Sequence, residues 1–198
     1  MKRTLIVVDL QVDFCPGGRL AVVGGDEIVD PVNRLMPAFD NVVLTQDWHP
    51  ADHSSFASQH PGAEPFTLVQ MDYGPQVLWP DHCVIGSTGA DFHPGLNTSR
   101  ADAIIRKGFR KTIDSYSAFY ENDYKTPTGL SGYLRERGLE DLYFVGLAYD
   151  FCVAWSSVDA ARQGFRVHVI EDATRAIDLN GSREGARRNM LAAGVSLI

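Results

Sequence analysis

The sequence predicts an α/β protein with three layers, in which a doubly wound, largely parallel sheet of six strands carries helices on both faces. Short runs of aliphatic and β-branched residues recur along the chain without strict alternation, as in strands that are buried on both faces. Segments with helical spacing lie between these runs, and most end at a glycine where a helix C-cap belongs. Strand, helix, strand order is typical of doubly wound folds.

The predicted strands are Thr4–Asp9, Val42–Thr45, Ala103–Arg106, Leu142–Val145, Arg166–Ile170 and Val195–Ile198. The predicted helices span about Glu27–Ala38, Leu130–Arg137, Phe151–Gln163 and Arg183–Ala193, and Gly138, Gly164 and Gly194 follow the last three. Residues 46–100 are rich in His, Pro, Gly, Ser and Asp and show little periodicity. A long irregular segment inside a compact domain is more often functional than idle.

Composition limits the classes of function. The 198 residues are 44% hydrophobic and 22% charged, the balance of a globular protein, and the length favours a single domain over residues 1–198. The net charge of −7 argues against a nucleic-acid partner. The longest aliphatic run near the start, Leu5–Val8, is far shorter than a signal-peptide core or a membrane span. Three widely spaced cysteines fit reduced thiols, so we expect a cytoplasmic protein with no membrane partner.

Chemically active side chains follow the predicted strands. The first strand ends at Asp9, the second leads into Asp47 and His49, the third into Lys107, and the fourth into a turn before Cys152. In open α/β sheets, ligands bind outside the carboxyl ends of the strands. The sequence therefore predicts that an acid, a metal-type cluster, a lysine and a cysteine converge on one edge of the sheet.

Cys152 is the candidate nucleophile. It lies just inside the start of a predicted helix, behind Asp150 as the expected N-cap, and a helix N-terminus favours the nucleophilic thiolate. The alternative is a buried cysteine that packs as a small hydrophobic residue, which is the commoner role of a lone cysteine. Position at a strand end favours the nucleophile, whereas Cys15 and Cys83 lack such a setting.

Asp9 and Lys107 are candidate partners of that thiol. A carboxylate at the end of an apolar strand pays a desolvation cost that raises its pKa toward that of a general base, unless it merely caps a turn. Lys107 is placed to lower the pKa of the cysteine, to stabilise a developing anion or to pair with Asp9, unless it is an ordinary surface lysine. Together with Cys152 they form a set suited to acyl transfer.

The histidines indicate a metal site. Five of the six, His49, His53, His60, His82 and His93, fall in residues 46–100, and Asp47 precedes the first by two positions. A carboxylate with imidazoles suits zinc, iron or manganese. The spacing alone does not choose His82 over His60 or His93, and any one of these histidines is by itself more often merely exposed.

Six blocks of sequence together resemble the nicotinamidases, also called pyrazinamidases, of the isochorismatase-like cysteine hydrolase superfamily. In order along the chain the blocks are Val7–Gly18 (VVDLQVDFCPGG), Gln46–Phe56 (QDWHPADHSSF), Trp79–Val84 (WPDHCV), Lys107–Gly108, Asp114–Phe119 (DSYSAF) and Gly146–Val153 (GLAYDFCV). They span nearly the whole chain in family order, and the combination is highly specific. Phe151 and Leu147 depart from the residues that relatives often carry at these positions.

The resemblance implies a fold, a set of site residues and an activity. The fold is that of the isochorismatase-like hydrolases, and the bond Leu147–Ala148 is expected to be a cis peptide. The implied catalytic residues are Asp9, Lys107 and Cys152, and the backbone of Ala148 and Cys152 is expected to form the oxyanion hole. The implied metal ligands are Asp47, His49, His53 and His82. The residues expected to hold the substrate ring are Phe14, Trp79 and Tyr116.

The implied reaction is metal-dependent hydrolysis of nicotinamide to nicotinate and ammonia through a thioester on Cys152, in NAD salvage, with pyrazinamide as a further substrate. One divalent metal ion is expected, zinc before iron or manganese. The expected partners are these small molecules, and the assembly is a monomer or a small homo-oligomer. The first alternative is another amidase or isochorismatase-like hydrolase of the same fold with a different small substrate, and the second is a non-catalytic metal-binding or ligand-sensing module.

Overall fold

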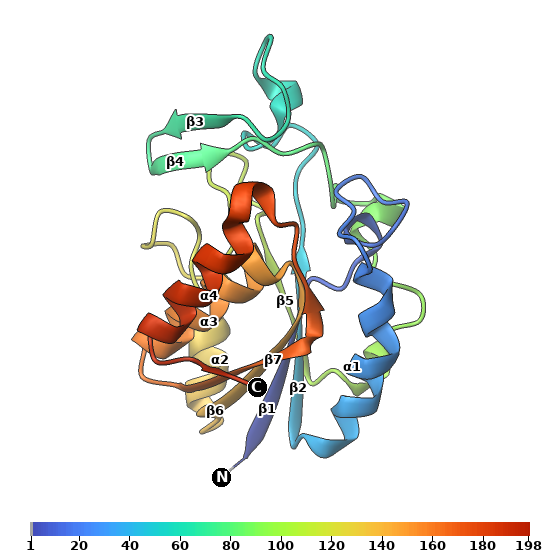
Figure 1. Cartoon of the computed structure of the whole chain (residues 1–198), viewed down its shortest axis with the longest axis vertical. Helices are drawn as coiled ribbons and strands as arrows, with labels where there is room; N and C mark the ends of the chain where they lie inside the picture. The colour runs from blue at the N-terminus through green and yellow to red at the C-terminus, as the bar shows by residue number, and fades with distance from the viewer. Residues whose placement is uncertain (1) are drawn as a thin grey trace.

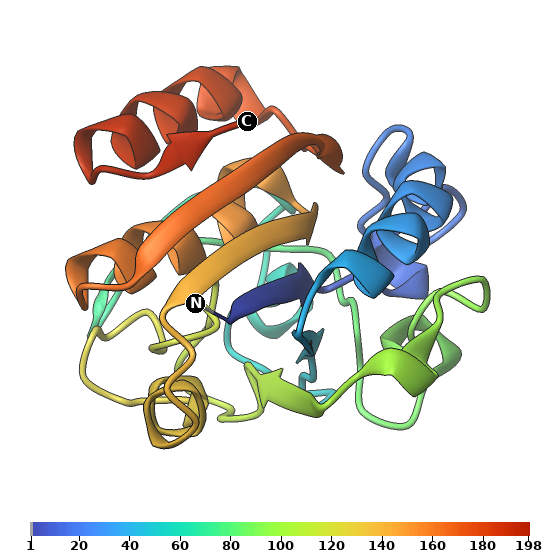
Figure 2. The same ribbon diagram turned by 90° about the horizontal axis from the view of Figure 1, so that it is seen from below.

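The computed structural model describes residues 2–198 and confirms the predicted fold class. A six-stranded sheet forms the centre, in the order β5-β2-β1-β6-β7-β8, and every neighbouring pair of strands is parallel. The strands are β1 (Arg3–Val8), β2 (Asn41–Asp47), β5 (Ala103–Lys107), β6 (Asp141–Leu147), β7 (Arg166–Arg175) and β8 (Ser196–Leu197). Figures 1 and 2 show the sheet between its helical layers.

Helices cover both faces because successive side chains of a strand point in opposite directions. Leu5 and Val7 of β1 pack in one buried cluster, whereas Ile6 and Val8 belong to a second cluster on the other face. The first cluster includes residues of α1 (Val29–Leu35), and the second includes residues of α2 (Leu130–Glu136), α3 (Ala154–Arg162) and α4 (Ser182–Ala192). Figure 2 shows α1 on the opposite side of the sheet from α2, α3 and α4. Among residues 2–198, no helix is long and apolar enough to cross a membrane.

The strand order reverses between β1 and β6. From β1 the chain builds outward through β2 to β5, then returns to β6 beside β1 and continues through β7 to β8. The carboxyl ends of β1 and β6 therefore form the switch point, where α/β sheets open a crevice for ligands. Gly146 of β6 keeps the two strands close, because a Cβ at this position would overlap the backbone of Val8.

Three features differ from the sequence-based expectation. Residues 46–100 are not wholly irregular, because β3 (Leu68–Met71) and β4 (Gly74–Val77) pair as an antiparallel hairpin beyond the carboxyl ends of the large sheet (Figure 1). The predicted helix at Glu27–Ala38 is divided, with short 3₁₀ turns on either side of α1. The helix predicted from Phe151 begins instead as a π-helical turn over Tyr149–Val153, and its N-cap position is Ala148 rather than Asp150.

Candidate active site

Asp9, Lys107 and Cys152 meet at the switch point, as the sequence predicts. The Nζ atom of Lys107 lies 2.9 Å from Oδ2 of Asp9 and 3.5 Å from Sγ of Cys152. All three side chains are buried, with Asp9 and Lys107 at 0% exposure and Cys152 at 6%. An acid, a cation and a thiol thus lie together in a buried site.

Each of the three is positioned by the end of a strand. Asp9 directly follows β1 in a left-handed backbone conformation (φ 44°), and its Oδ1 accepts a hydrogen bond from Oγ1 of Thr45 in β2 at 2.5 Å. Lys107 ends β5, and its ammonium also donates to the carbonyl of Ser115 at 2.8 Å and to Oδ1 of Asp47 at 2.7 Å. Cys152 lies in the π-helical turn that follows β6.

Burial controls the protonation of this group. Burial raises the pKa of the Asp9 carboxyl against the opposing effect of Lys107. Burial also raises the pKa of the Cys152 thiol well above its usual range, again against Lys107. For Lys107 itself burial lowers the pKa, but Asp47 and Asp9 together raise it well above its usual range. Burial thus opposes the helix N-terminus and Lys107, which favour the thiolate, and Cys152 keeps a proton that a base has to accept.

Beside this group, three ligand-type atoms face one another. Oδ2 of Asp47 lies 3.1 Å from Nε2 of His49 and 3.4 Å from Nε2 of His82, and all three residues are buried. Burial raises the pKa of the Asp47 carboxyl, but Lys107, His49 and His82 together lower it well below its usual range. The carboxylate is thus ionised and ready to bind a cation.

The chemistry of these donors fits a divalent metal ion. Nδ1 of His49 lies 2.8 Å from the carbonyl of Gly108, and Nδ1 of His82 lies 2.8 Å from the carbonyl of Pro80. Because a carbonyl only accepts hydrogen bonds, each Nδ1 carries a proton, and Nε2 is the ring nitrogen that a metal ion would bind. Burial lowers the pKa of the His49 ring, but Asp47 and Asp114 raise it above its usual value, so Nε2 of His49 donates a hydrogen bond to the Asp47 carboxylate, and a metal ion would take the place of that proton. Nε2 of His49 and Nε2 of His82 both lie beside Oδ2 of Asp47, and Asp with two His is a common ligand set for zinc and related metals.

His53, the fourth predicted ligand, is not part of this trio. Its ring lies 4.5 Å from that of His49, but its Nδ1 contacts Oγ of Ser55 at 2.8 Å and its Nε2 contacts the carbonyl of Ile113 at 3.2 Å. His53 belongs instead to a second group of potential ligands, with His49 and Asp114. The spacing of the histidines also left His60 and His93 as possible ligands. In the structure, Nε2 of His60 contacts the carbonyl of Ser54, and Nδ1 of His93 accepts a hydrogen bond from the backbone N–H of Gly95.

A small cavity opens onto the sulfur of Cys152. Phe14, Trp79 and Tyr116, the three predicted ring-binding residues, all line it. The hydroxyl of Tyr116 accepts hydrogen bonds from Nε1 of Trp79 at 3.1 Å and from the amide of Gln76 at 2.9 Å, so this wall is rigidly built. The remaining lining residues are Leu20, Asp47, His82, Asp114, Ala148, Phe151, Cys152 and Ile177.

Several of these residues were missed by sequence reasoning. Asp114 is 2% exposed, and its Oδ1 lies 4.0 Å from Nε2 of His49, while Gln76 donates to its Oδ2 at 2.7 Å. The sequence indicated Asp114 only through its position at the start of the block Asp114–Phe119, directly before Ser115 and Tyr116. Phe151 and Ile177 carry no pattern that distinguishes a cavity wall from a core, and Ile177 reaches the cavity from 25 residues beyond Cys152 in the chain.

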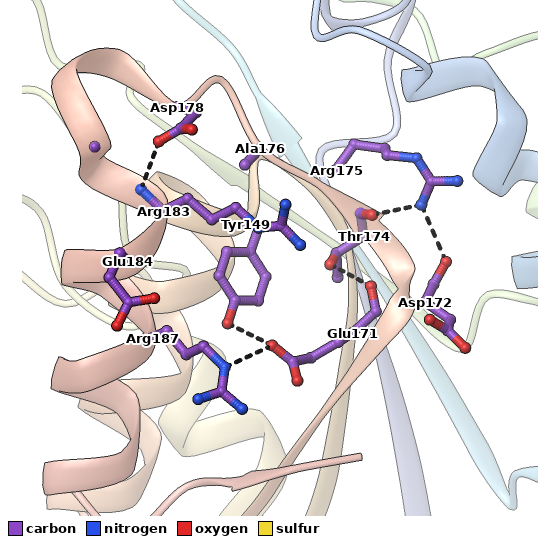
Figure 3. Close-up of a pocket in the computed structure, with 11 residues that line it drawn as sticks. Tyr149, Glu171, Asp172, Thr174, Arg175, Ala176, Asp178, Arg183, Glu184 and Arg187 are labelled. Carbon is purple, nitrogen blue, oxygen red and sulfur yellow. Dashed lines mark hydrogen bonds and ion pairs between the residues drawn. The ribbon is translucent and has the colours of Figure 1, made fainter.

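A larger pocket lies on the other side of the nucleophile's turn, between the end of β7 and the start of α4 (Figure 3). It contains Tyr149 and several charged residues, including Glu171, Arg183 and Arg187, and neither a cysteine nor a histidine lines it. Glu171 accepts a hydrogen bond from Tyr149 and pairs with Arg187 at 3.5 Å. The nucleophile and the candidate metal ligands all lie outside this pocket.

The comparison with known families agrees with this geometry. A family model described as the isochorismatase domain matches residues 3–198. The chain belongs to the isochorismatase family. The predicted cis peptide, a feature that the resemblance placed at Leu147–Ala148, is also present.

Among isochorismatase-family relatives, a nicotinamidase from Acinetobacter baylyi is 56% identical over 194 residues, which cover 98% of this chain and 91% of that protein. A solved structure of a nicotinamidase/pyrazinamidase from Acinetobacter baumanii has a TM-score of 0.98 and 56% identity, covering 100% of this chain and 95% of that one. The structure of a pyrazinamidase from Pyrococcus horikoshii in complex with zinc has a TM-score of 0.80 and 33% identity, covering 100% and 99%. The resemblance to nicotinamidases is confirmed.

Proposed function

We propose that this chain is a metal-dependent cysteine amidase that hydrolyses nicotinamide to nicotinate and ammonia, and pyrazinamide in the same way. The observation that carries the proposal is the position of Cys152, beside Asp9 and Lys107, at an aromatic cavity that also exposes Asp47 and His82. The names of relatives that match nearly the whole chain support the substrate class. The reaction supplies nicotinate for NAD salvage.

In the first half of the reaction, the thiol of Cys152 transfers its proton to Asp9, whose raised pKa suits a general base. Lys107 stabilises the sulfur as it becomes negative, because its ammonium lies 3.5 Å away. The sulfur attacks the carboxamide carbon, and the backbone N–H groups of Ala148 and Cys152 hold the oxyanion, a contribution worth ~3 kcal/mol per donor in comparable sites.

In the second half, Asp9 returns the proton to the amide nitrogen, the C–N bond breaks and ammonia leaves. A nicotinoyl thioester remains on Cys152. A water molecule then attacks the thioester carbon, and Asp9, which is ionised again, takes a proton from this water. The C–S bond breaks, and Asp9 passes the proton to the departing sulfur. Nicotinate and the free thiol are the products, so each turnover consumes one water and releases one ammonia.

Asp47, His49 and His82 would hold one divalent metal ion, and we propose zinc because a relative's structure contains it. When bound, the ion supplies a Lewis acid for the lone pair of the pyridine nitrogen. Phe14, Trp79 and Tyr116 hold the ring faces and edges in the cavity. Together these contacts direct the carboxamide carbon toward Cys152, which raises the effective concentration of the reacting groups.

Ammonia release from nicotinamide by the purified, metal-loaded protein tests this function. We expect Cys152→Ala to abolish release while it retains the metal, and the matched variant Cys15→Ala, which changes another buried thiol outside the cavity lining, to keep it. Metal-loaded wild-type protein that releases no ammonia from nicotinamide would refute the proposal. Equal activity of Cys152→Ala and wild type would refute the assigned nucleophile.

A metal titration tests the ligand set separately. Stripped protein is titrated with Zn²⁺, Fe²⁺ or Mn²⁺ alone, and binding is followed by calorimetry rather than by activity. We expect His82→Ala to weaken binding strongly and His93→Ala, which changes a histidine outside both ligand-type groups, to leave it unchanged.

We also propose a cytoplasmic location, because Cys15, Cys83 and Cys152 are all free thiols.

A further inference from the structure

Asp150, two residues before the nucleophile, does not cap the helix that contains Cys152. Its carboxylate is buried at 5% exposure and accepts hydrogen bonds from a segment far along the chain. Oδ1 accepts from the backbone N–H of Ile177 at 3.0 Å, and Oδ2 accepts from the backbone N–H of Asp178 at 2.7 Å and from Oγ of Ser182 at 2.5 Å. One side chain of the nucleophile's turn therefore satisfies three donors of another segment.

Two of these donors belong to residues 176–181, which join β7 to α4 and which we call the cavity loop, and the third, Ser182, is the first residue of α4. The backbone of the cavity loop is unusual, because Asp178 and Asn180 adopt left-handed conformations with φ of 57° and 53°. Such conformations cost free energy in residues other than glycine and persist where the surroundings impose them. Ile177 of the cavity loop lines the same cavity as Cys152. The bonds to Asp150 thus hold a wall of the substrate cavity in place.

The turn is also attached on its other side. The hydroxyl of Tyr149 donates to Oε1 of Glu171 in β7 at 2.8 Å (Figure 3). The carboxylate of Asp178 accepts a hydrogen bond from the backbone N–H of Arg183 at 3.2 Å, which ties the cavity loop to the first turn of α4. Tyr149 thus links the nucleophile's turn to β7, and the adjacent Asp150 links the same turn to the cavity loop and to the start of α4.

We propose that Asp150 is a positioning residue, which fixes Cys152 relative to Ile177 and so sets both the attack geometry and the fit of the substrate ring. The proposal rests on the proposed amidase function. Asp150 does not line the cavity, so its effect reaches the reaction only through the turn and the cavity loop. A displacement of about 1 Å at a reacting group costs on the order of a hundredfold in rate.

Asp150→Asn is the principal test variant, because it keeps the shape of the side chain but turns an NH₂ group toward donors. Asp123→Asn is its matched control. The Asp123 carboxylate also accepts from two backbone N–H groups and one hydroxyl, those of Lys125 and Thr126, but it holds a different loop. Ser182→Ala removes only one of the three bonds to Asp150 and keeps the carboxylate.

The first readout is steady-state ammonia release at a temperature where every variant is folded. We expect Asp150→Asn to lower kcat/KM by ~10- to 100-fold, with a fall in kcat from the displaced sulfur and a rise in KM from the displaced Ile177. Ser182→Ala should show a smaller loss in the same direction and decides the matter if Asp150→Asn does not fold. Asp123→Asn should match wild type.

The second readout needs no substrate. Iodoacetamide labelling of Cys152, followed by peptide mass spectrometry, should be several-fold faster in Asp150→Asn than in wild type, because the loosened turn exposes the sulfur. A purely structural role would lower the melting temperature without changing either rate in folded protein. Rates unchanged from wild type, or an equal loss in Asp123→Asn, would overturn the proposal. If wild type releases no ammonia, the amidase function fails, and the labelling ratio still decides the role of Asp150.

Discussion

The ammonium of Lys107 compensates two buried carboxylates, and Lys107→Met removes it while keeping a long apolar stem. Lys107 is 0% exposed and lies 2.9 Å from Oδ2 of Asp9 and 2.7 Å from Oδ1 of Asp47. The variant leaves both acids without their main cation in a site that excludes water. Protein stripped of metal shows the effect most fully, because a bound divalent ion would itself compensate Asp47.

The expected loss is large. Removing one partner of a buried ion pair costs ~3–5 kcal/mol, since the remaining charge stays buried and uncompensated. For a chain of 198 residues, each kcal/mol shifts the melting temperature by about 2–4 °C, so we expect a decrease of roughly 6–20 °C. Lys111→Met is the control, because Lys111 pairs with Asp52 at 2.6 Å with both side chains exposed, and such surface pairs contribute little to stability.

Chemical denaturation of the stripped proteins, with thermal melts in parallel, measures both variants. The double variant Asp9→Asn/Lys107→Met should recover part of the lost stability, because one of the two uncompensated charges is then removed. A Lys107→Met protein as stable as Lys111→Met would refute the reasoning, and so would a double variant that is less stable than Lys107→Met alone.

Three further variants test separate parts of the structure. Thr45→Val removes a hydrogen bond that lowers the pKa of Asp9, so this pKa rises further. The acidic limb of the pH profile of kcat/KM should therefore move to higher pH, and an unmoved limb would argue against Asp9 as the base. Gly108→Ala places a Cβ against the ring of His49. We expect the affinity for a divalent ion, measured by chelator competition, to fall by ~10- to 100-fold, and an unchanged affinity would show that Gly108 does not position His49. Gly132→Ala, in α2 with open space around it, should stabilise the protein by ~0.5–1 kcal/mol in chemical denaturation, and a destabilisation would contradict the helix propensity argument.

The order and type of the main elements were predictable because they depend on local patterns. Apolar runs such as Leu5–Val8 fit only strands covered on both faces, and glycines such as Gly138 and Gly164 stop the helices where the periodicity ends. The hairpin at Leu68–Val77 was missed because its strands are short and only partly buried, so that it lacks the clear alternation of a half-buried sheet.

The candidate site was predictable to the extent that strand ends determine it. Asp9, Lys107 and Cys152 each follow a strand, and parallel strands bring their carboxyl ends to one edge. His53 groups with His49 and Asp114 rather than with Asp47 and His82, and this depends on which loop atoms its two ring nitrogens contact. No spacing rule encodes those contacts.

The sequence by itself determined the family, the fold class and the chemical identity of the groups at the ends of the strands, because these follow from motifs and local periodicity. The order of the strands in the sheet, and with it the position of the switch point, came from the tertiary structure. Tertiary structure alone decided how these groups act on one another. Burial raises the pKa of Cys152 and of Asp9, and the burial of a side chain is a property of the packed molecule. The hydrogen bond between Asp150 and Ile177, 27 residues away in the chain, likewise depends on the packing of α4 against the nucleophile's turn, which no local pattern specifies.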